Sequence, residues 1–167
     1  MLERFHAEVE RLVADGLTVH EMERWWLTRL LMKRGVVGFA LGRRVYLRRD
    51  RWGTAAGYET LRHDAQHARD MRRFTLVGFG LLYFLLPVPF VVSGRAWLEW
   101  RAYRESMRAR SELEGAIPDA MVAWVVRTVT GPVYAFAFPF PGLVRGWVER
   151  ERRASSSSRT SGHGLSR

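Results

Sequence analysis

The 167-residue chain contains no cysteine and a single lysine, Lys33. Without cysteine, the chain has no disulfides, no thiolate metal ligands and no cysteine nucleophile. Any metal site must therefore consist of histidine, aspartate and glutamate side chains. The first residues, MLERFHAEVERLVADG, also lack the apolar region of a signal peptide. We therefore expect a cytoplasmic protein, with the inner face of the membrane as a place of association.

Positive charge is abundant and comes almost entirely from arginine. The chain has 27 lysine and arginine residues against 17 acidic residues, which gives a net charge of +10. Such a balance favours anionic partners, among them a membrane surface. Arginine runs at 43–44, 48–51 and 72–73 are compatible with phosphate contacts, but no helix-turn-helix, zinc-finger or RNA-recognition signature accompanies them. We expect no specific nucleic-acid partner.

Residues 74–92 carry no charge over 19 positions, which is close to the length of a membrane span. Gly78, Gly80, Pro87 and Pro89 interrupt this stretch, and prolines break a helical backbone ladder. Two alternatives follow. Either the stretch folds back, buried in the domain or dipped into a membrane face, or it crosses the bilayer in a small integral membrane protein. We favour the fold-back and predict that residues 74–92 do not span a bilayer.

The N-terminal third predicts helices followed by a short extended segment. Leu2, Phe5, Val9, Leu12 and Val13 share one side of a first helix. Thr18 followed by Glu21 has the spacing of a capping box, which predicts a second helix ending at Gly35. The core face of that helix would consist of Trp26, Leu27, Leu30 and Leu31. Residues 43–48 predict a short strand or extended edge.

Three further helices are predicted from apolar spacing and from glycine and proline signals. They cover residues 59–77, residues 94–115, and a segment opened by Pro118 and ended by Gly131. A short helix follows the aromatic segment near residue 140. The serine-rich residues 151–167 have the low complexity typical of a disordered tail.

The stretch LRHDAQH, residues 61–67, is the strongest candidate for a functional site. Residues four apart share a helix face, so His63 and His67 can present both imidazoles to one zinc ion. Asp64, beside the first histidine, would act as general base toward a metal-activated water. The alternative is a polar helix face that carries two solvated histidines.

A zinc site of this type needs a third protein ligand, and Glu99 in the following helix is the candidate. Arg95 lies one turn before it and would hold the carboxylate, while Tyr103 lies one turn after it and would donate to a developing oxyanion. Asp70 is another candidate, but we interpret it as a surface residue because ligation by successive turns of one helix is strained. A bilayer-spanning 74–92 would separate His67 from Glu99 by about 30 Å and exclude the site.

Together these motifs resemble small bacterial gluzincin-like metallopeptidase domains of the HExxH zincin type. That family's pattern is similar to GRRVYL at 42–47, LRHDAQH at 61–67 and RAWLEWRAY at 95–103. The resemblance implies that His63, His67 and Glu99 bind zinc and that Asp64 is the base. Aspartate replaces the family's glutamate and is one methylene shorter, which puts the hydrolytic activity in question.

We therefore expect a mainly α fold with a short β edge strand or hairpin and a zincin-like helical core. The expected parts are N-terminal helices at 1–35, a zincin-like domain at 36–150 and a tail at 151–167. The predicted function is zinc binding with hydrolysis of a peptide or protein substrate, which would pair with residues 44–48. The alternative is an arginine-rich membrane-associated or integral membrane protein without catalysis.

Overall fold

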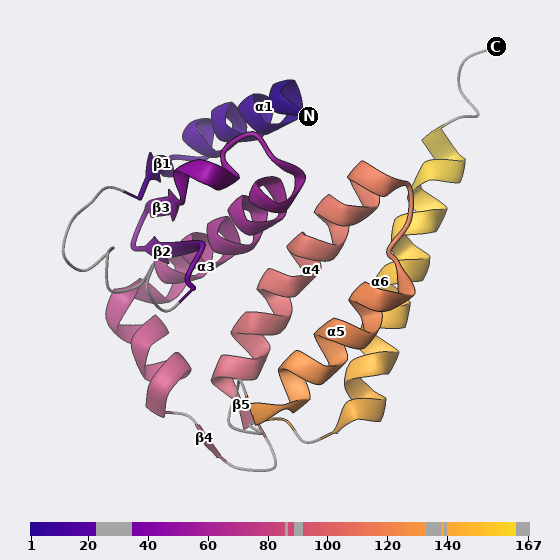
Figure 1. Ribbon diagram of the computed structural model, residues 1–167. Coiled ribbons are helices and arrows are strands. Elements are labelled where there is room, and N and C mark those ends of the chain that lie inside the picture. Colours follow the sequence, from indigo (N-terminus) through magenta and orange to yellow (C-terminus); the bar gives the residue numbers. More distant parts are fainter. Residues whose placement is uncertain (23–34, 86, 89–91, 133–137, 139, 163–167) are drawn as a thin grey trace. The chain divides into compact units, whose positions relative to one another are not determined.

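The computed structural model describes residues 1–22, 35–85, 87–88, 92–132, 138 and 140–162. The chain forms two compact units, Met1–Gly80 and Leu81–Arg167. Helices dominate, and a small three-stranded sheet belongs to the first unit (Figure 1). The predicted fold class, mainly α with a short β element, is confirmed. The boundary between the units falls inside the apolar stretch 74–92.

Helix α1 (Leu2–Ala14) opens the first unit. Phe5 and Leu12 are fully buried, whereas Leu2 and Val13, predicted on the same apolar side, are each 54% exposed. The buried face is therefore narrower than the apolar pattern indicates. It also includes a polar side chain, Glu8.

Strand β1 (Thr18–Glu21) occupies the residues predicted to begin a second helix. It pairs in parallel with β3 (Arg44–Leu47), with Thr18 opposite Arg44 and Glu21 opposite Leu47. The predicted capping box is therefore wrong. A cap contributes only about 1 kcal/mol, so pairing with a distant strand can outweigh it. The core face predicted for that helix lies outside the described residues.

Strand β3 confirms the strand predicted at 43–48 but lies in the centre of the sheet. Strand β2 (Gly38–Leu41) pairs with it in antiparallel fashion, so the order is β1-β3-β2. A two-residue loop joins β2 to β3, and its first residue, Gly42, has a φ of 58°, as a type II′ hairpin turn requires. Because both sides of β3 are already paired, the prediction that residues 44–48 pair with a substrate is wrong.

Helix α3 (Ala55–Gly80) follows a 3-10 turn, η1 (Arg49–Arg51), and packs against β2 and β3 (Figure 1). Leu61, Ala65 and Ala68 are fully buried, at the four- and three-residue spacing of one helix face. Two alanines in this face let the helix approach the sheet closely. The helix predicted at 59–77 is confirmed, and it carries the HDxxH motif.

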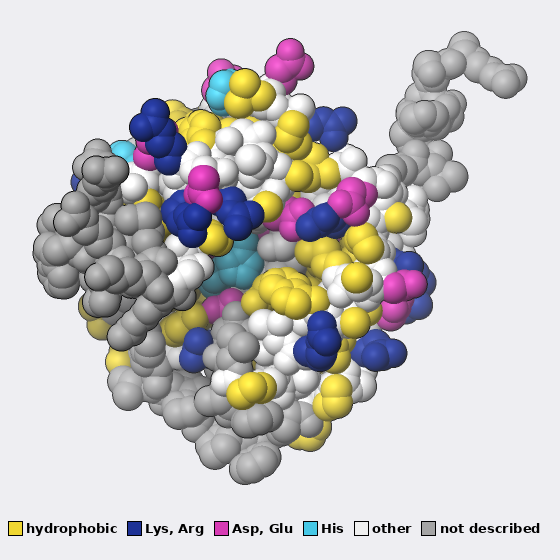
Figure 2. Space-filling model, in the orientation of Figure 1, with side chains coloured by type: hydrophobic (Ala, Val, Ile, Leu, Met, Phe, Trp, Pro, Cys, Tyr) yellow, Lys and Arg dark blue, Asp and Glu magenta, His cyan; other side chains and the backbone are white. Residues whose placement is uncertain are grey.

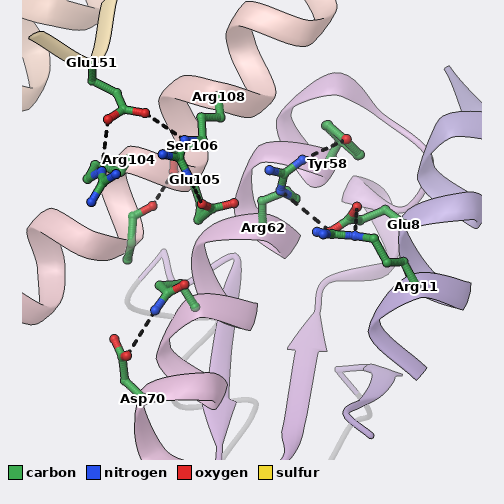
Figure 3. Close-up of polar contacts among 12 residues, drawn as sticks. Glu8, Arg11, Tyr58, Arg62, Asp70, Arg104, Glu105, Ser106, Arg108 and Glu151 are labelled. Atoms are coloured by element: carbon green, nitrogen blue, oxygen red, sulfur yellow. Dashed lines mark hydrogen bonds and ion pairs between the residues drawn. The ribbon is translucent and has the colours of Figure 1, made fainter. Parts of the chain in front are cut away.

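A buried ion pair connects α1 with α3 (Figure 3). Nε of Arg62 lies 3.6 Å from Oε1 of Glu8, and the two side chains are 9% and 6% exposed. Arg11 also donates to Glu8, through Nε at 2.9 Å. The other side of the Arg62 guanidinium donates to the Tyr58 hydroxyl at 3.2 Å. This network fixes the residue that directly precedes the first histidine of the motif.

The apolar stretch 74–92 changes direction several times. The helical geometry of α3 breaks at Thr75, whose φ and ψ are 62° and 164°, and the Thr75 hydroxyl accepts a hydrogen bond from the Gly78 N–H at 3.2 Å. A π-helical turn, η2 (Leu81–Leu85), leads to β4 (Pro87–Val88), which pairs in antiparallel fashion with β5 (Val92–Ser93). Among the residues described here, no helix has both the length and the apolarity needed to cross a bilayer.

The second unit is built mainly from α4 (Gly94–Glu114), α5 (Asp119–Thr130) and α6 (Pro141–Gly162). Helix α4 ends at Gly115, whose φ is 85°, as its sequence predicts. Pro118, predicted as the first residue of this helix, is the N-cap of α5, which begins one position later, at Asp119. The core of this unit consists of Tyr103, Met107, Ile117, Val122, Val125, Val126, Val129, Val144 and Val148.

Helix α6 extends to Gly162, through residues predicted to form a disordered tail. Serine hydroxyls in this part of the helix donate to backbone carbonyls one turn earlier, Ser156 to Arg153 at 2.9 Å and Ser157 to Ala154 at 3.0 Å. On the same helix, Glu151 accepts hydrogen bonds from Arg104 and Arg108 of α4 (Figure 3). The remaining tail residues, 163–167, lie outside the described part of the chain.

Candidate metal centre

The two histidines of α3 converge on one point. The Nε2 atoms of His63 and His67 lie 3.2 Å apart, and the ring planes are inclined by 76° with centroids 4.9 Å apart. Two nitrogens bound to one tetrahedral zinc ion, each at about 2.0–2.1 Å, are separated by about 3.3–3.4 Å. The spacing of the two rings therefore fits one edge of a zinc coordination tetrahedron.

Packing holds the second of these rings in place. The His67 side chain is 9% exposed, and the Phe79 ring meets it edge-on with the centroids 5.9 Å apart. His63 is partly exposed. The pair thus has one buried and one accessible member. A metal ion would therefore enter from solvent on the side of His63.

The Asp64 carboxylate is buried against strand β2. Its side chain is 6% exposed, and a Cβ added at Gly38 would collide with Asp64 Oδ2 and lie 2.7 Å from Thr60 Cγ2. Only a glycine leaves room for the acid at this point of the sheet. The predicted general base therefore occupies a confined space between α3 and β2.

The predicted third ligand, Glu99, lies in the second unit and has a defined environment there. It is 4% exposed, and its Oε1 accepts a 2.5 Å hydrogen bond from the Tyr83 hydroxyl of η2. Burial, together with the charge and the hydrogen bond of Glu99, raises the pKa of Tyr83, while Arg95 acts in the opposite direction. Tyr83 is therefore protonated at neutral pH and serves as a donor to Glu99.

Arg95 lies over the Tyr83 ring, with Cζ 4.9 Å from the ring centroid. Arg95 was predicted to hold the Glu99 carboxylate, and the contact described here is with the tyrosine that donates to Glu99. Tyr103, predicted as an oxyanion donor, is 6% exposed and belongs to the helical core, where its ring meets Trp124 edge-on at 5.2 Å.

Sequence reasoning missed Tyr83 as a partner of Glu99. The two residues are 16 positions apart: Tyr83 belongs to the π-helical turn η2, Glu99 belongs to α4, and the paired strands β4 and β5 lie between them in the chain. No helical spacing relates them. The only available signal was a tyrosine, a residue that seeks a hydrogen-bond partner when buried, inside an otherwise apolar stretch.

His6, His20 and Asp70, which are not among the predicted ligands, contact neighbouring side chains. His20 stacks on Tyr46 with centroids 5.4 Å apart, and His6 meets the Phe5 ring edge-on at 6.4 Å. Asp70 was interpreted as a surface residue, but it is fully buried and accepts a hydrogen bond from Gln66 at 3.0 Å. The surface interpretation of Asp70 is therefore wrong.

Many arginines form local ion pairs. Examples are Arg48 with Asp50, Arg110 with Glu114 and Arg152 with Asp119. Figure 2 shows basic side chains in small separate groups, several of them beside acidic ones. Much of the positive charge of the described residues is therefore balanced locally.

Comparison with known proteins adds no relative: no family model, no curated protein and no solved structure matches the chain.

Proposed function

We propose that the chain binds one zinc ion through His63, His67 and Glu99, as a metallopeptidase-like protein. Each of the three offers an imidazole nitrogen or a carboxylate oxygen, the ligand types that zinc takes in the absence of cysteine. The observation that carries the proposal is the 3.2 Å separation of the two histidine Nε2 atoms. The proposal requires Glu99, from the second unit, to reach the histidine pair of the first.

The surroundings of the ligands support this assignment. Zinc ligands are commonly oriented by hydrogen bonds from neighbouring groups, and the Tyr83 hydroxyl provides one to Glu99. Phe79 restricts rotation of the His67 ring by packing against it. Both contacts reduce the conformational freedom that the ligands would lose when they bind an ion.

Three protein ligands leave a fourth tetrahedral position open, as in catalytic zinc sites. A zinc ion in such a site polarises a carbonyl and lowers the pKa of water to about 7. We assign Asp64 as the proton acceptor, with a peptide or protein as substrate, and a bound zinc ion would supply the activation of water. Its short side chain is confined beside Gly38, so we expect slower hydrolysis than a glutamate in an open site would give.

Zinc affinity tests the ligand set. In competition with a chromogenic chelator, Glu99→Gln should weaken zinc binding of the full chain by at least about tenfold, because losing even a group that supports a ligand has that effect. Glu112→Gln is the matched control, because Glu112 is an exposed residue of the same helix. Equal affinities for both variants would remove Glu99 from the site.

Hydrolysis of an unstructured protein substrate tests the catalytic part separately. Asp64→Asn keeps the size of the side chain but removes its ability to accept a proton, so activity should fall by about 10²–10⁴-fold, with zinc affinity retained. If Asp64→Asn were as active as the unaltered chain, Asp64 would not be the base. The zinc site itself would be unaffected by that result.

A further inference from the structure

A cleft rich in arginine lies where the end of α1 meets α3 in the first unit. Ala14, Asp15, Arg69, Arg72 and Arg73 line it. Three guanidinium groups and one carboxylate give these side chains a formal charge of +2 (three positive minus one negative). The cleft is therefore suited to an anion.

Two of the cleft arginines are held in position by Asp15, the residue that caps the C-terminus of α1. Arg69 Nη2 donates to the Asp15 carboxylate at 2.9 Å, and Arg72 Nη1 donates to the Asp15 backbone carbonyl at 2.6 Å. From the turn between β2 and β3, Arg43 Nε donates to the Gly16 carbonyl at 2.9 Å. Each guanidinium has five N–H donors, so these bonds leave further donors on each arginine for a ligand.

Exposed apolar side chains begin three positions after the last of these arginines. Leu76 is 54% exposed and Val77 is 72% exposed. The break in α3 at Thr75 redirects the last turn of the helix that carries them, and the Thr75 hydroxyl caps that turn. A cationic cleft is thus continuous along the chain with a protruding apolar turn.

We propose that Arg69, Arg72, Arg73, Leu76 and Val77, here called the α3 docking surface, bind the surface of an anionic bilayer. The guanidinium groups would bind lipid phosphates, and Leu76 and Val77 would enter the boundary of the acyl chains. This pairing of basic and apolar side chains is what interfacial membrane binding requires. A soluble anion or a nucleic acid accounts for the arginines but gives no role to two exposed aliphatic side chains. The proposal does not depend on zinc.

Sedimentation of the full chain with lipid vesicles tests the surface. Binding is expected with phosphatidylcholine vesicles containing phosphatidylserine and not with phosphatidylcholine alone. Arg72→Gln/Arg73→Gln should lower the partition coefficient about thirtyfold, from about fivefold for each arginine near the surface. Arg150→Gln/Arg153→Gln is the matched control, because it removes the same charge from exposed positions of α6 and should have little effect.

A second variant tests the two apolar side chains of the α3 docking surface. Leu76→Ser/Val77→Ser should weaken binding to the anionic vesicles by at least about tenfold, because about 0.8 kcal/mol is lost with each methylene removed from the acyl boundary. An equal effect of the two arginine pairs would mean non-specific attraction and would overturn the proposal. Unchanged binding of Leu76→Ser/Val77→Ser would also overturn the proposal, because the cleft would then be a site for soluble anions or nucleic acid.

Discussion

The Asp64 carboxylate fills the space beside Gly38 that a side chain on β2 would otherwise occupy. This relationship joins the proposed base of the motif to the sheet. It makes the fit between α3 and β2 dependent on a glycine at one position and a short acid at the other.

Replacement of Gly38 by alanine should therefore destabilise the protein. The new Cβ would meet both Asp64 Oδ2 and Thr60 Cγ2, so we expect a loss of about 1–3 kcal/mol in the free energy of unfolding in urea. Gly146→Ala is the control, because no atom lies within 4 Å of a Cβ there, and it should leave stability unchanged or raised by up to about 1 kcal/mol. Equal stability of the two variants would contradict the close packing at Gly38.

Asp64→Glu should also lose stability. From the sequence alone, a longer carboxylate would be expected to reach water better and raise any peptidase activity, unless neighbouring elements crowd it. Because Asp64 is 6% exposed and confined at Gly38, one more methylene should cost about 1–3 kcal/mol in the free energy of unfolding. Thermal denaturation of Asp64→Glu and of Asp64→Asn, which keeps the size of the side chain, measures the difference in stability. If Asp64→Glu were as stable as Asp64→Asn, the space between Asp64 and Gly38 would be open to a longer side chain.

The elements that the sequence predicted correctly are those marked by residues within the element itself or next to it. Helix α4 has a clear stop at Gly115, and α3 carries buried apolar residues at helical spacing over many turns. Strand β1 was missed because TVHE resembles a helix start when only neighbours are considered, whereas its partner, β3, lies 26 residues further along. The central position of β3 could not be predicted for the same reason, since it depends on β1.

In the candidate site, too, contacts within one helix could be predicted from the sequence, whereas contacts between distant segments could not. The convergence of His63 and His67 follows from a four-residue spacing on one helix. The Tyr83 hydrogen bond to Glu99 depends on how the chain folds back between them, and the burial of Asp64 depends on a glycine in a strand 26 residues earlier. Neither leaves a periodic pattern in the sequence.

Removal of the Tyr83 hydroxyl should weaken zinc binding. Tyr83→Phe deletes the donor to Glu99 Oε1 while keeping the ring, and loss of a supporting hydrogen bond of this kind lowers metal affinity by about ten- to a hundredfold. Tyr103→Phe is the comparison, because the Tyr103 ring packs against Trp124 in the helical core. If the two variants bound zinc with the same affinity, Tyr83 would have no part in the centre.

The ion pair between Glu8 and Arg62 should contribute strongly to stability. Glu8→Gln would leave the Arg62 guanidinium buried without its carboxylate, which costs about 3–5 kcal/mol for a buried pair. Glu114→Gln breaks the Arg110–Glu114 pair, whose side chains are 33% and 45% exposed, and should cost less than about 1 kcal/mol. Urea denaturation of both variants measures the contrast, and similar losses would show that the Glu8 pair is not effectively buried.

Zinc content of the purified full chain tests the central claim most directly. After exposure to zinc and removal of the unbound ion by dialysis, elemental analysis should find close to one zinc per chain, and essentially none in His63→Ala/His67→Ala. The control, His6→Ala/His20→Ala, removes two exposed histidines of the same unit and should keep the full amount. Stoichiometric zinc in the His63→Ala/His67→Ala protein, or none in the unaltered chain, would contradict the proposed centre.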